Sequence, residues 1–219
     1  IGSELWSDET GFLDAHEASG ITGICGSGII EVIAEMYLAG IISADGVING
    51  ALNSRSDKLI KEGRTWSYVL HFAYNKDESD IVITQNDVRQ IQLAKAALYA
   101  GIKLLMAEMG VNSVERIRLA GAFGSHISVS HAMVLGLIPD CPLDQVTSAG
   151  NAAGVGARIA LLDRNARIEI EQSIRRAERI ETAVAADFQE HFIGAMSLPH
   201  KNDPFTQLFS VITPPNAKV

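Results

Sequence analysis

Two short glycine-rich stretches, about a hundred residues apart, constrain this sequence most. The first, at 24–29, reads Ile-Cys-Gly-Ser-Gly-Ile, and the second, at 119–126, reads Leu-Ala-Gly-Ala-Phe-Gly-Ser-His. Glycine lets a backbone adopt positive φ or approach a ligand closely. The first stretch runs into a helical pattern, and a helix N-terminus offers unpaired N–H groups to an anion. The pair predicts a nucleotide cradle; the alternative is two ordinary tight turns of an α/β fold.

Strand-like and helix-like segments alternate after residue 80, which predicts βαβ units and a mostly parallel sheet. We expect strands at 81–83, 114–120, 145–148 and 179–182, and helices at 85–109, 129–135, 165–177 and 185–196, with another helix starting at Gly150. Ligands bind at the carboxyl ends of parallel strands. The turn at 121–124 and the helix start at Gly150 both follow strands, so we expect them to open on the same edge.

The segment before residue 80 is less regular. We expect a short strand at 1–6, a helix at 28–40, a loop or short elements at 43–63, and a hairpin of strands 66–74 and 81–83. The helix at 85–109 is the clearest element of the chain. Thr84 and Asp87 have capping-box spacing at its start. We expect one apolar face on this helix, made of Val88, Ile91, Ala94, Leu98, Ile102, Leu105 and Met109.

Composition narrows the class of protein. The chain has 219 residues and 47% hydrophobic residues with few aromatics, which favours α/β layers. A net charge of −8 argues against a nucleic-acid partner, and no apolar run approaches the ~18–20 residues of a membrane span. Two distant cysteines, Cys25 and Cys141, argue against a disulfide framework or cysteine metal knuckle. We expect a cytoplasmic protein in which Cys25 packs as a small hydrophobe.

The chain opens at Ile1 rather than Met, and we expect it to be a piece of a longer protein. We assign residues 1–197 to one lobe. Residues 198–219 are rich in proline and polar residues, and we expect them to form an extended C-terminal arm.

Three stretches, in this order, carry a resemblance to a known family: 23–31, 117–127 and the small-residue run 150–157. Together they resemble the C-terminal part of the reductive activators of corrinoid proteins, over about residues 20–200. Those are iron–sulfur proteins whose ATPase part belongs to the superfamily of acetate and sugar kinases, heat-shock ATPases and actin. The resemblance implies an actin-like, ribonuclease-H-like ATPase lobe with a mixed sheet flanked by helices.

The resemblance also implies an activity. The family uses ATP, with Mg, to drive one-electron reduction of cob(II)alamin to cob(I)alamin on a partner corrinoid protein or corrinoid-dependent methyltransferase. A [2Fe–2S] ferredoxin domain lies at the family's N-terminus and is absent from this chain. By similarity, the residues that border the nucleotide (ATP or ADP) are Gly26, Ser27, Gly28, Gly121, Ala122, Phe123, Gly124 and Ser125.

Two parts of the family pattern do not occur in this sequence: the Asp-Gly-Thr phosphate hairpins and the four-cysteine cluster motif. We therefore expect the chain to bind nucleotide weakly or not at all by itself, to hydrolyse no ATP alone, and to hold no iron–sulfur cluster. We predict no metal site either, because His126 and His131 are five residues apart and lack a Glu between them.

Other interpretations stay open. Ser27 does not fit the G-x-S-x-G nucleophile elbow, so a helix cap or a polar contact is favoured over a catalytic role. A second interpretation is that the chain is a dimerisation or partner-docking module that does not bind nucleotide. It would use the helix from Gly150 and the long helix at 85–109, and a homodimer is one form of it. A sugar or acid kinase ranks last, because no loop presents the required Asp.

Overall fold

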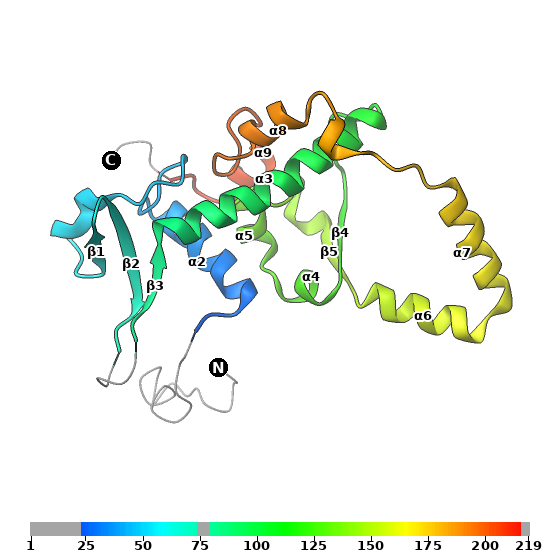
Figure 1. Cartoon of the computed structure of the whole chain (residues 1–219), viewed down its shortest axis with the longest axis horizontal. Coiled ribbons are helices and arrows are strands. Elements are labelled where there is room, and N and C mark those ends of the chain that lie inside the picture. Colours follow the sequence, from blue (N-terminus) through cyan, green and yellow to red (C-terminus); the bar gives the residue numbers. More distant parts are fainter. Residues whose placement is uncertain (1–22, 74–78, 216–219) are drawn as a thin grey trace.

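In the computed structural model the chain is described at residues 23–73 and 79–215, the side chain of residue 183 aside (Figure 1). The strand expected at 1–6 lies outside these residues. The order of elements is α/β, as expected, with the long helix α3 (Gln85–Glu108) crossing the middle of the molecule. None of the helices in the described ranges combines the length and apolar character needed to cross a membrane.

The first sheet is antiparallel and has the order β1-β2-β3. Its strands are β1 (Leu59–Glu62), β2 (Thr65–His71) and β3 (Ile81–Thr84). Tyr68 pairs with Leu59 on one side and with Ile83 on the other. The hairpin of β2 and β3 is confirmed. Strand β1 lies inside the segment expected to be a loop or short elements.

The second sheet consists of two parallel strands, β4 (Ile117–Ala120) and β5 (Val146–Gly150). The expectation of a mostly parallel sheet is wrong for the described strands, because β3 pairs with β2 instead of joining β4. The strand expected at 179–182 is also wrong. Residues 177–181 lie in irregular structure before the turn η4 (Thr182–Val184), and the exposed side chains of Arg179 and Glu181 pair with each other.

The helices come close to their predicted positions. The remaining helices and turns are α2 (Gly26–Leu38), η2 (Gly50–Ser54), α4 (Ala122–His126), α5 (Val129–Val134), η3 (Leu143–Gln145), α6 (Ala152–Leu162), α7 (Arg164–Arg176), α8 (Phe188–Gly194) and α9 (Thr206–Phe209). The core lies between α2, α3 and α5, where Ile33, Ala96 and Met133 are fully buried. The capping box of α3 is confirmed: Thr84 N donates to Asp87 Oδ2 at 2.8 Å, and Asp87 N donates to Thr84 Oγ1 at 3.1 Å.

The expected apolar face of α3 is wrong in part. Val88 is buried, but Leu98 and Leu105 are exposed, and Met109 is 74% exposed. The buried side of α3 instead carries Gln92, Lys95 and Tyr99. Those polar side chains are buried because carbonyl and carboxylate acceptors from distant parts of the chain lie opposite them.

These acceptors belong mainly to the C-terminal segment. Gln92 Nε2 donates to Met196 O at 2.8 Å, and Lys95 Nζ donates to the carbonyls of Ser197 and Pro199, the latter at 2.6 Å. Tyr99 donates to Asp203 Oδ2 at 2.6 Å. Since helix α3 has its own backbone groups paired, the side chains supply the donors that this irregular segment needs.

The described part of the expected C-terminal arm packs against the rest of the chain, so its description as extended is wrong. Leu198, Phe205 and Leu208 are buried. The carboxylate of Asp140 also accepts hydrogen bonds from the backbone N–H groups of residues 207 and 208, at 2.8 and 3.0 Å. The burial of these apolar side chains and the hydrogen bonds to Asp140 hold the segment against the rest of the chain, despite its proline-rich composition. The division of the chain at residue 197 stays a prediction.

Helices α6 and α7 project away from the rest of the molecule (Figure 1). Neither helix contains a buried residue. Small residues of α6 such as Ala153 and Ala157 would let this helix lie close to a sheet or another helix. In the described part of the chain both side chains are exposed, so this face of α6 is uncovered.

Candidate functional site

The first glycine turn leads into helix α2. Cys25 caps the helix, because its Sγ accepts a hydrogen bond from Gly28 N at 3.4 Å. The Ser27 hydroxyl lies 3.3 Å from the same sulfur. Hydrogen bonds from Ser27 and then from Gly28 lower the pKa of the Cys25 thiol. Cys25 is exposed, so its expected packing as a hydrophobe is wrong, and the cap is Cys25 rather than Ser27.

The two glycines of this turn have different surroundings. A Cβ atom at Gly28 would lie 2.8 Å from Ile24 Cγ2 and 3.3 Å from the capping sulfur, so the Ile24 side chain, together with the cap, would have to move to make room for it. A Cβ atom at Gly26 would lie 3.9 Å from Cε2 of Phe123, which is ordinary van der Waals contact. Gly26 therefore faces the second glycine turn directly.

The second glycine turn joins β4 to α4. Gly121 has φ 98° and ψ 172°, a conformation that is essentially restricted to glycine. Its N–H donates to Gly150 O at 2.8 Å, which ties the turn to the end of β5. At Gly124, a Cβ atom would lie 2.9 Å from Leu119 Cβ and 3.0 Å from the Leu119 carbonyl carbon. Gly121 is thus needed for its backbone angles, and Gly124 for the close approach of α4 to β4.

A chain of hydroxyl groups joins the ends of the two parallel strands. Ser125 Oγ donates to Gly121 O at 3.1 Å, Ser148 Oγ donates to Ser125 Oγ at 3.2 Å, and Gly150 N donates to Ser148 Oγ at 3.1 Å. Ser148 is not among the site residues predicted from the sequence. Its signal was its position two residues before Gly150, in a strand expected to end at the same edge as β4.

The small-residue run at 150–157 contains the start of helix α6. Asn151 caps this helix by accepting a hydrogen bond from Gly154 N on Oδ1, at 2.9 Å. A Cβ atom at Gly154 would lie 2.7 Å from the Asn151 amide nitrogen, so this glycine also makes room for a cap. The prediction that Gly121 and Gly150 open on one edge is confirmed by the parallel pairing of β4 and β5.

The structure brings the two predicted motifs together on one open face. Phe123 is 52% exposed and lies over Gly26, and Ala122 and Ser125 are also exposed. None of the eight predicted site residues carries a charge. Such a face suits the base and ribose of a nucleotide, whereas the phosphates need cationic groups or further backbone donors.

Next to this face, His131 links α5 to α2. Its Nε2 lies 2.7 Å from Glu35 Oε1, and its Nδ1 lies 2.7 Å from Ser128 Oγ. The ring thus bridges the helix that starts at the first glycine turn to the helix that follows the second turn. Among the residues that the structure describes, no cluster of three or more His, Cys, Asp or Glu side chains could hold a metal ion.

Two glycine turns lie at one edge of this α/β fold, with the N-terminus of α2 beside them, and comparison with known proteins assigns the fold to the actin-like ATPase (ASKHA) type. Over residues 5–209 the chain matches the family described as the C-terminal domain of RACo, the ASKHA domain. The chain belongs to this family.

Two known proteins are similar to this chain. The corrinoid activation enzyme RamQ of Eubacterium limosum is 35% identical over 179 residues, which is 78% of this chain. The solved structure of a reductive activator for corrinoid, iron–sulfur protein superposes with a TM-score of 0.73 and 33% identity, over 84% of this chain. The alignment covers 30% of the length of each of these proteins, so the chain corresponds to a part of them.

Proposed function

We propose that this chain is the nucleotide-binding lobe of an ATP-dependent reductive activator that restores cob(II)alamin to cob(I)alamin on a partner corrinoid protein. The observation that carries the proposal is the contact between the two glycine motifs, Gly26 against Phe123, beside the paired ends of β4 and β5. Membership of the ASKHA family and the names of the two relatives support it.

The residues of the face have distinct roles in this proposal. The Gly121 turn and the Phe123 ring border the adenosine, and Ser27 with its two flanking glycines forms the opposite border. The motif residues carry no charged side chain, so charged groups that would hold the phosphates and Mg lie outside them. When bound, ATP supplies the free energy for an uphill one-electron transfer.

The electron itself comes from elsewhere in the proposed system. A [2Fe–2S] cluster of the ferredoxin type takes four cysteine ligands, and this chain has only two cysteines. Cys25 is exposed in the first glycine turn, whereas Cys141 is buried and donates to Glu115 O. We therefore assign the cluster to a separate N-terminal domain, and we place the activator and its corrinoid partner, or corrinoid-dependent methyltransferase, in the cytoplasm.

Substitution of Gly121 by Val tests the nucleotide site. A β-branched residue cannot adopt φ 98° and ψ 172°, so the turn must change shape. We expect Gly121→Val to weaken ADP binding at least tenfold, measured by titration calorimetry on a polypeptide that also contains the complementary lobe. The chain alone is expected to bind ADP weakly or not at all.

Gly110→Val is the matched control for this substitution. Gly110 also has positive φ, 65°, but follows α3 rather than bordering the proposed face. The control is expected to keep the affinity for ADP. If the two-lobed polypeptide binds no ADP, or if both variants bind as the wild type does, the nucleotide proposal is wrong.

The exposed helices α6 and α7 favour a second function, as a dimerisation or partner-docking module. Apart from Arg158, helix α6 consists of apolar and small residues, a composition typical of a helix that is covered by other parts of a protein. Leu161 and Leu162 are 76% and 84% exposed. Other exposed aliphatic residues on the two helices are Val155, Ile159, Ile168, Ile170 and Ile174. Many exposed apolar side chains on two neighbouring helices indicate an interaction site.

Light scattering tests the docking function. We expect the mass of the chain to rise with concentration, and the double variant Leu161→Lys/Leu162→Lys to remain monomeric, because two ammonium groups would be desolvated in the contact. Val211→Lys is the control, since Val211 is also exposed but lies outside α6 and α7. A wild-type chain that is monomeric at every concentration would contradict self-association through these helices.

A further inference from the structure

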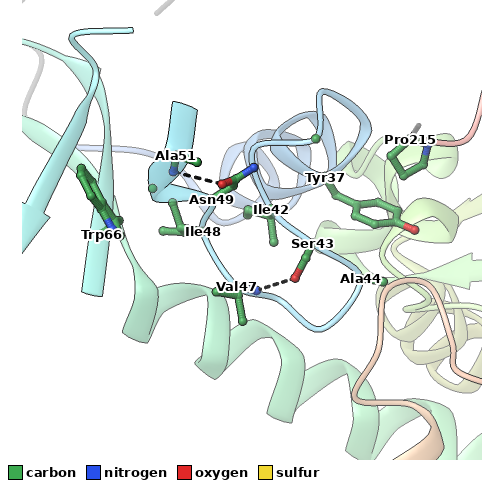
Figure 2. Close-up of a pocket in the computed structure, with 12 residues that line it drawn as sticks. Tyr37, Ile42, Ser43, Ala44, Val47, Ile48, Asn49, Ala51, Trp66 and Pro215 are labelled. Atoms are coloured by element: carbon green, nitrogen blue, oxygen red, sulfur yellow. Dashed lines mark hydrogen bonds between the residues drawn. The ribbon is translucent and has the colours of Figure 1, made fainter. Parts of the chain in front are cut away.

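A cavity of about 940 Å³ lies at the C-terminal end of α2, away from the glycine turns (Figure 2). Its floor is the loop that runs from Gly40 to η2, with Ile42 and Ile48 as apolar lining. Trp66 of β2 stands at one end, and Tyr37 and Pro215 stand at the other. Helix α2 has 13 residues and is therefore about 20 Å long, so the cavity is distinct from the face at Gly26.

Tyr37 places a polar group into this cavity. The residue is only 6% exposed, yet its hydroxyl has no hydrogen-bond partner among the described residues. In Figure 2 the hydroxyl lies between Pro215 and Ala44. Burial raises the pKa of Tyr37, so the group stays protonated and can donate a hydrogen bond. The hydroxyl oxygen is not among the fully buried unpaired atoms, so water reaches it from the cavity, and an acceptor atom of a ligand can take the place of that water.

The opposite end of the cavity offers a second aromatic donor. The indole of Trp66 packs against Gly50, where a Cβ atom would lie 2.0 Å from Nε1. Within the described residues the indole N–H donates to no acceptor. Gly50 therefore holds the ring at the cavity wall, and any larger residue would displace it.

Two further side chains use their acceptors and leave their donors available. Asn49 Oδ1 accepts from Ala51 N at 3.1 Å, and Ser43 Oγ accepts from Val47 N at 3.2 Å (Figure 2). The Asn49 amide NH₂ and the Ser43 hydroxyl remain as donors. None of the described residues that line the cavity carries a charge. The wall thus combines apolar surface with neutral hydrogen-bond donors.

We propose that this cavity binds an uncharged small molecule with a flat apolar body and a carbonyl oxygen or ring nitrogen as acceptor. The volume falls within the range of about 300–1,000 Å³ that is typical of small-molecule sites. The rings of Tyr37 and Trp66 at the two ends can pack against a flat ligand, and the hydrogen-bond donors of the wall can pair with acceptor atoms of that ligand. A phosphate or carboxylate ligand is disfavoured, because it would lose its hydration without meeting a cation.

Two probes of the same shape test this proposal: naphthalene-2-carboxamide, which is neutral, and naphthalene-2-carboxylate, which is charged. We expect the carboxamide to bind the wild-type chain in a titration followed by ligand-observed NMR, and the carboxylate to bind at least tenfold more weakly. Tyr37→Phe removes one donor and is expected to weaken carboxamide binding about fivefold. Trp66→Phe keeps the aromatic wall and is expected to have a similar effect.

Tyr68→Phe is the matched control, because Tyr68 lies on β2 beside the cavity but does not line it. It is expected to bind the carboxamide as the wild type does. Three results would each overturn the proposal: no carboxamide binding at millimolar concentration, equal binding of the two probes, or unchanged affinity in both Tyr37→Phe and Trp66→Phe. Thermal unfolding of each variant shows whether it is folded.

Discussion

We expect Gly136→Ala to lower the free energy of unfolding by about 4 kcal/mol, near the top of the range for single substitutions. Gly136 follows α5 with φ 70°, where a residue with a Cβ atom costs about 1–2 kcal/mol. A Cβ atom there would also lie 2.1 Å from Pro199 O and 2.9 Å from Pro199 C. These are backbone atoms, so the segment that contains Pro199 must move. Its hydrogen bond from Lys95 is then lost.

Urea denaturation of the chain measures this effect, and Gly110→Ala is its control. Gly110 has nearly the same backbone angle, φ 65°, but nothing lies within 4 Å of its Cβ position. The control is expected to lose only about 1 kcal/mol, from the strained angle alone. Equal losses in the two variants would mean that the segment around Pro199 does not pack against α5.

The expected and observed helices agree where the deciding residues are neighbours in the chain. The start of α3 depends on Thr84 and Asp87, three residues apart, and the sequence alone reveals that pair. The turn at Gly121 was likewise predicted because a strand-like run, a glycine and a helix follow one another directly. Local patterns of this kind determine local structure, so helix starts and turns can be predicted from them without knowledge of the fold.

The buried face of α3 could not be predicted in the same way. Hydrophobic periodicity selects Leu98 and Leu105, but the structure buries Gln92 and Lys95 instead. Their acceptors lie more than a hundred residues later, in the segment at 196–199. A prediction from hydrophobic periodicity assumes that polar side chains face water. On this face of α3, backbone carbonyls of a distant segment accept the hydrogen bonds that water would otherwise accept.

The positions of the two glycine turns were predicted, but the contacts that support them were not. The glycine pattern located the two turns correctly, yet it could not separate Gly121, which is needed for its angles, from Gly124, which is needed for space. Cys25 was misinterpreted because a thiol is an uncommon helix cap. Ser148 joins the site through parallel pairing of strands, and such pairing is a property of the fold.

The buried ammonium of Lys95 predicts that the stability of the chain depends on pH. Burial lowers the pKa of Lys95 from its ordinary value of 10.5 to about 7. Between these two values the unfolded chain binds more protons than the folded chain, so the free energy of unfolding rises with pH. For this single group the rise from pH 7 to pH 9 is expected to be about 2 kcal/mol.

Urea denaturation of the wild type and of Lys95→Met, at pH 7 and at pH 9, isolates this contribution. Methionine fills a similar volume but carries no titrating group, so the variant is expected to lack the rise. The difference between the two proteins cancels groups that titrate in both, including Cys141, whose pKa burial raises. Lys201→Met, which removes an exposed ammonium from the neighbouring segment, is expected to keep the wild-type slope. If Lys95→Met keeps it as well, the folded chain holds the Lys95 ammonium charged, and its carbonyl acceptors at Ser197 and Pro199 outweigh its burial.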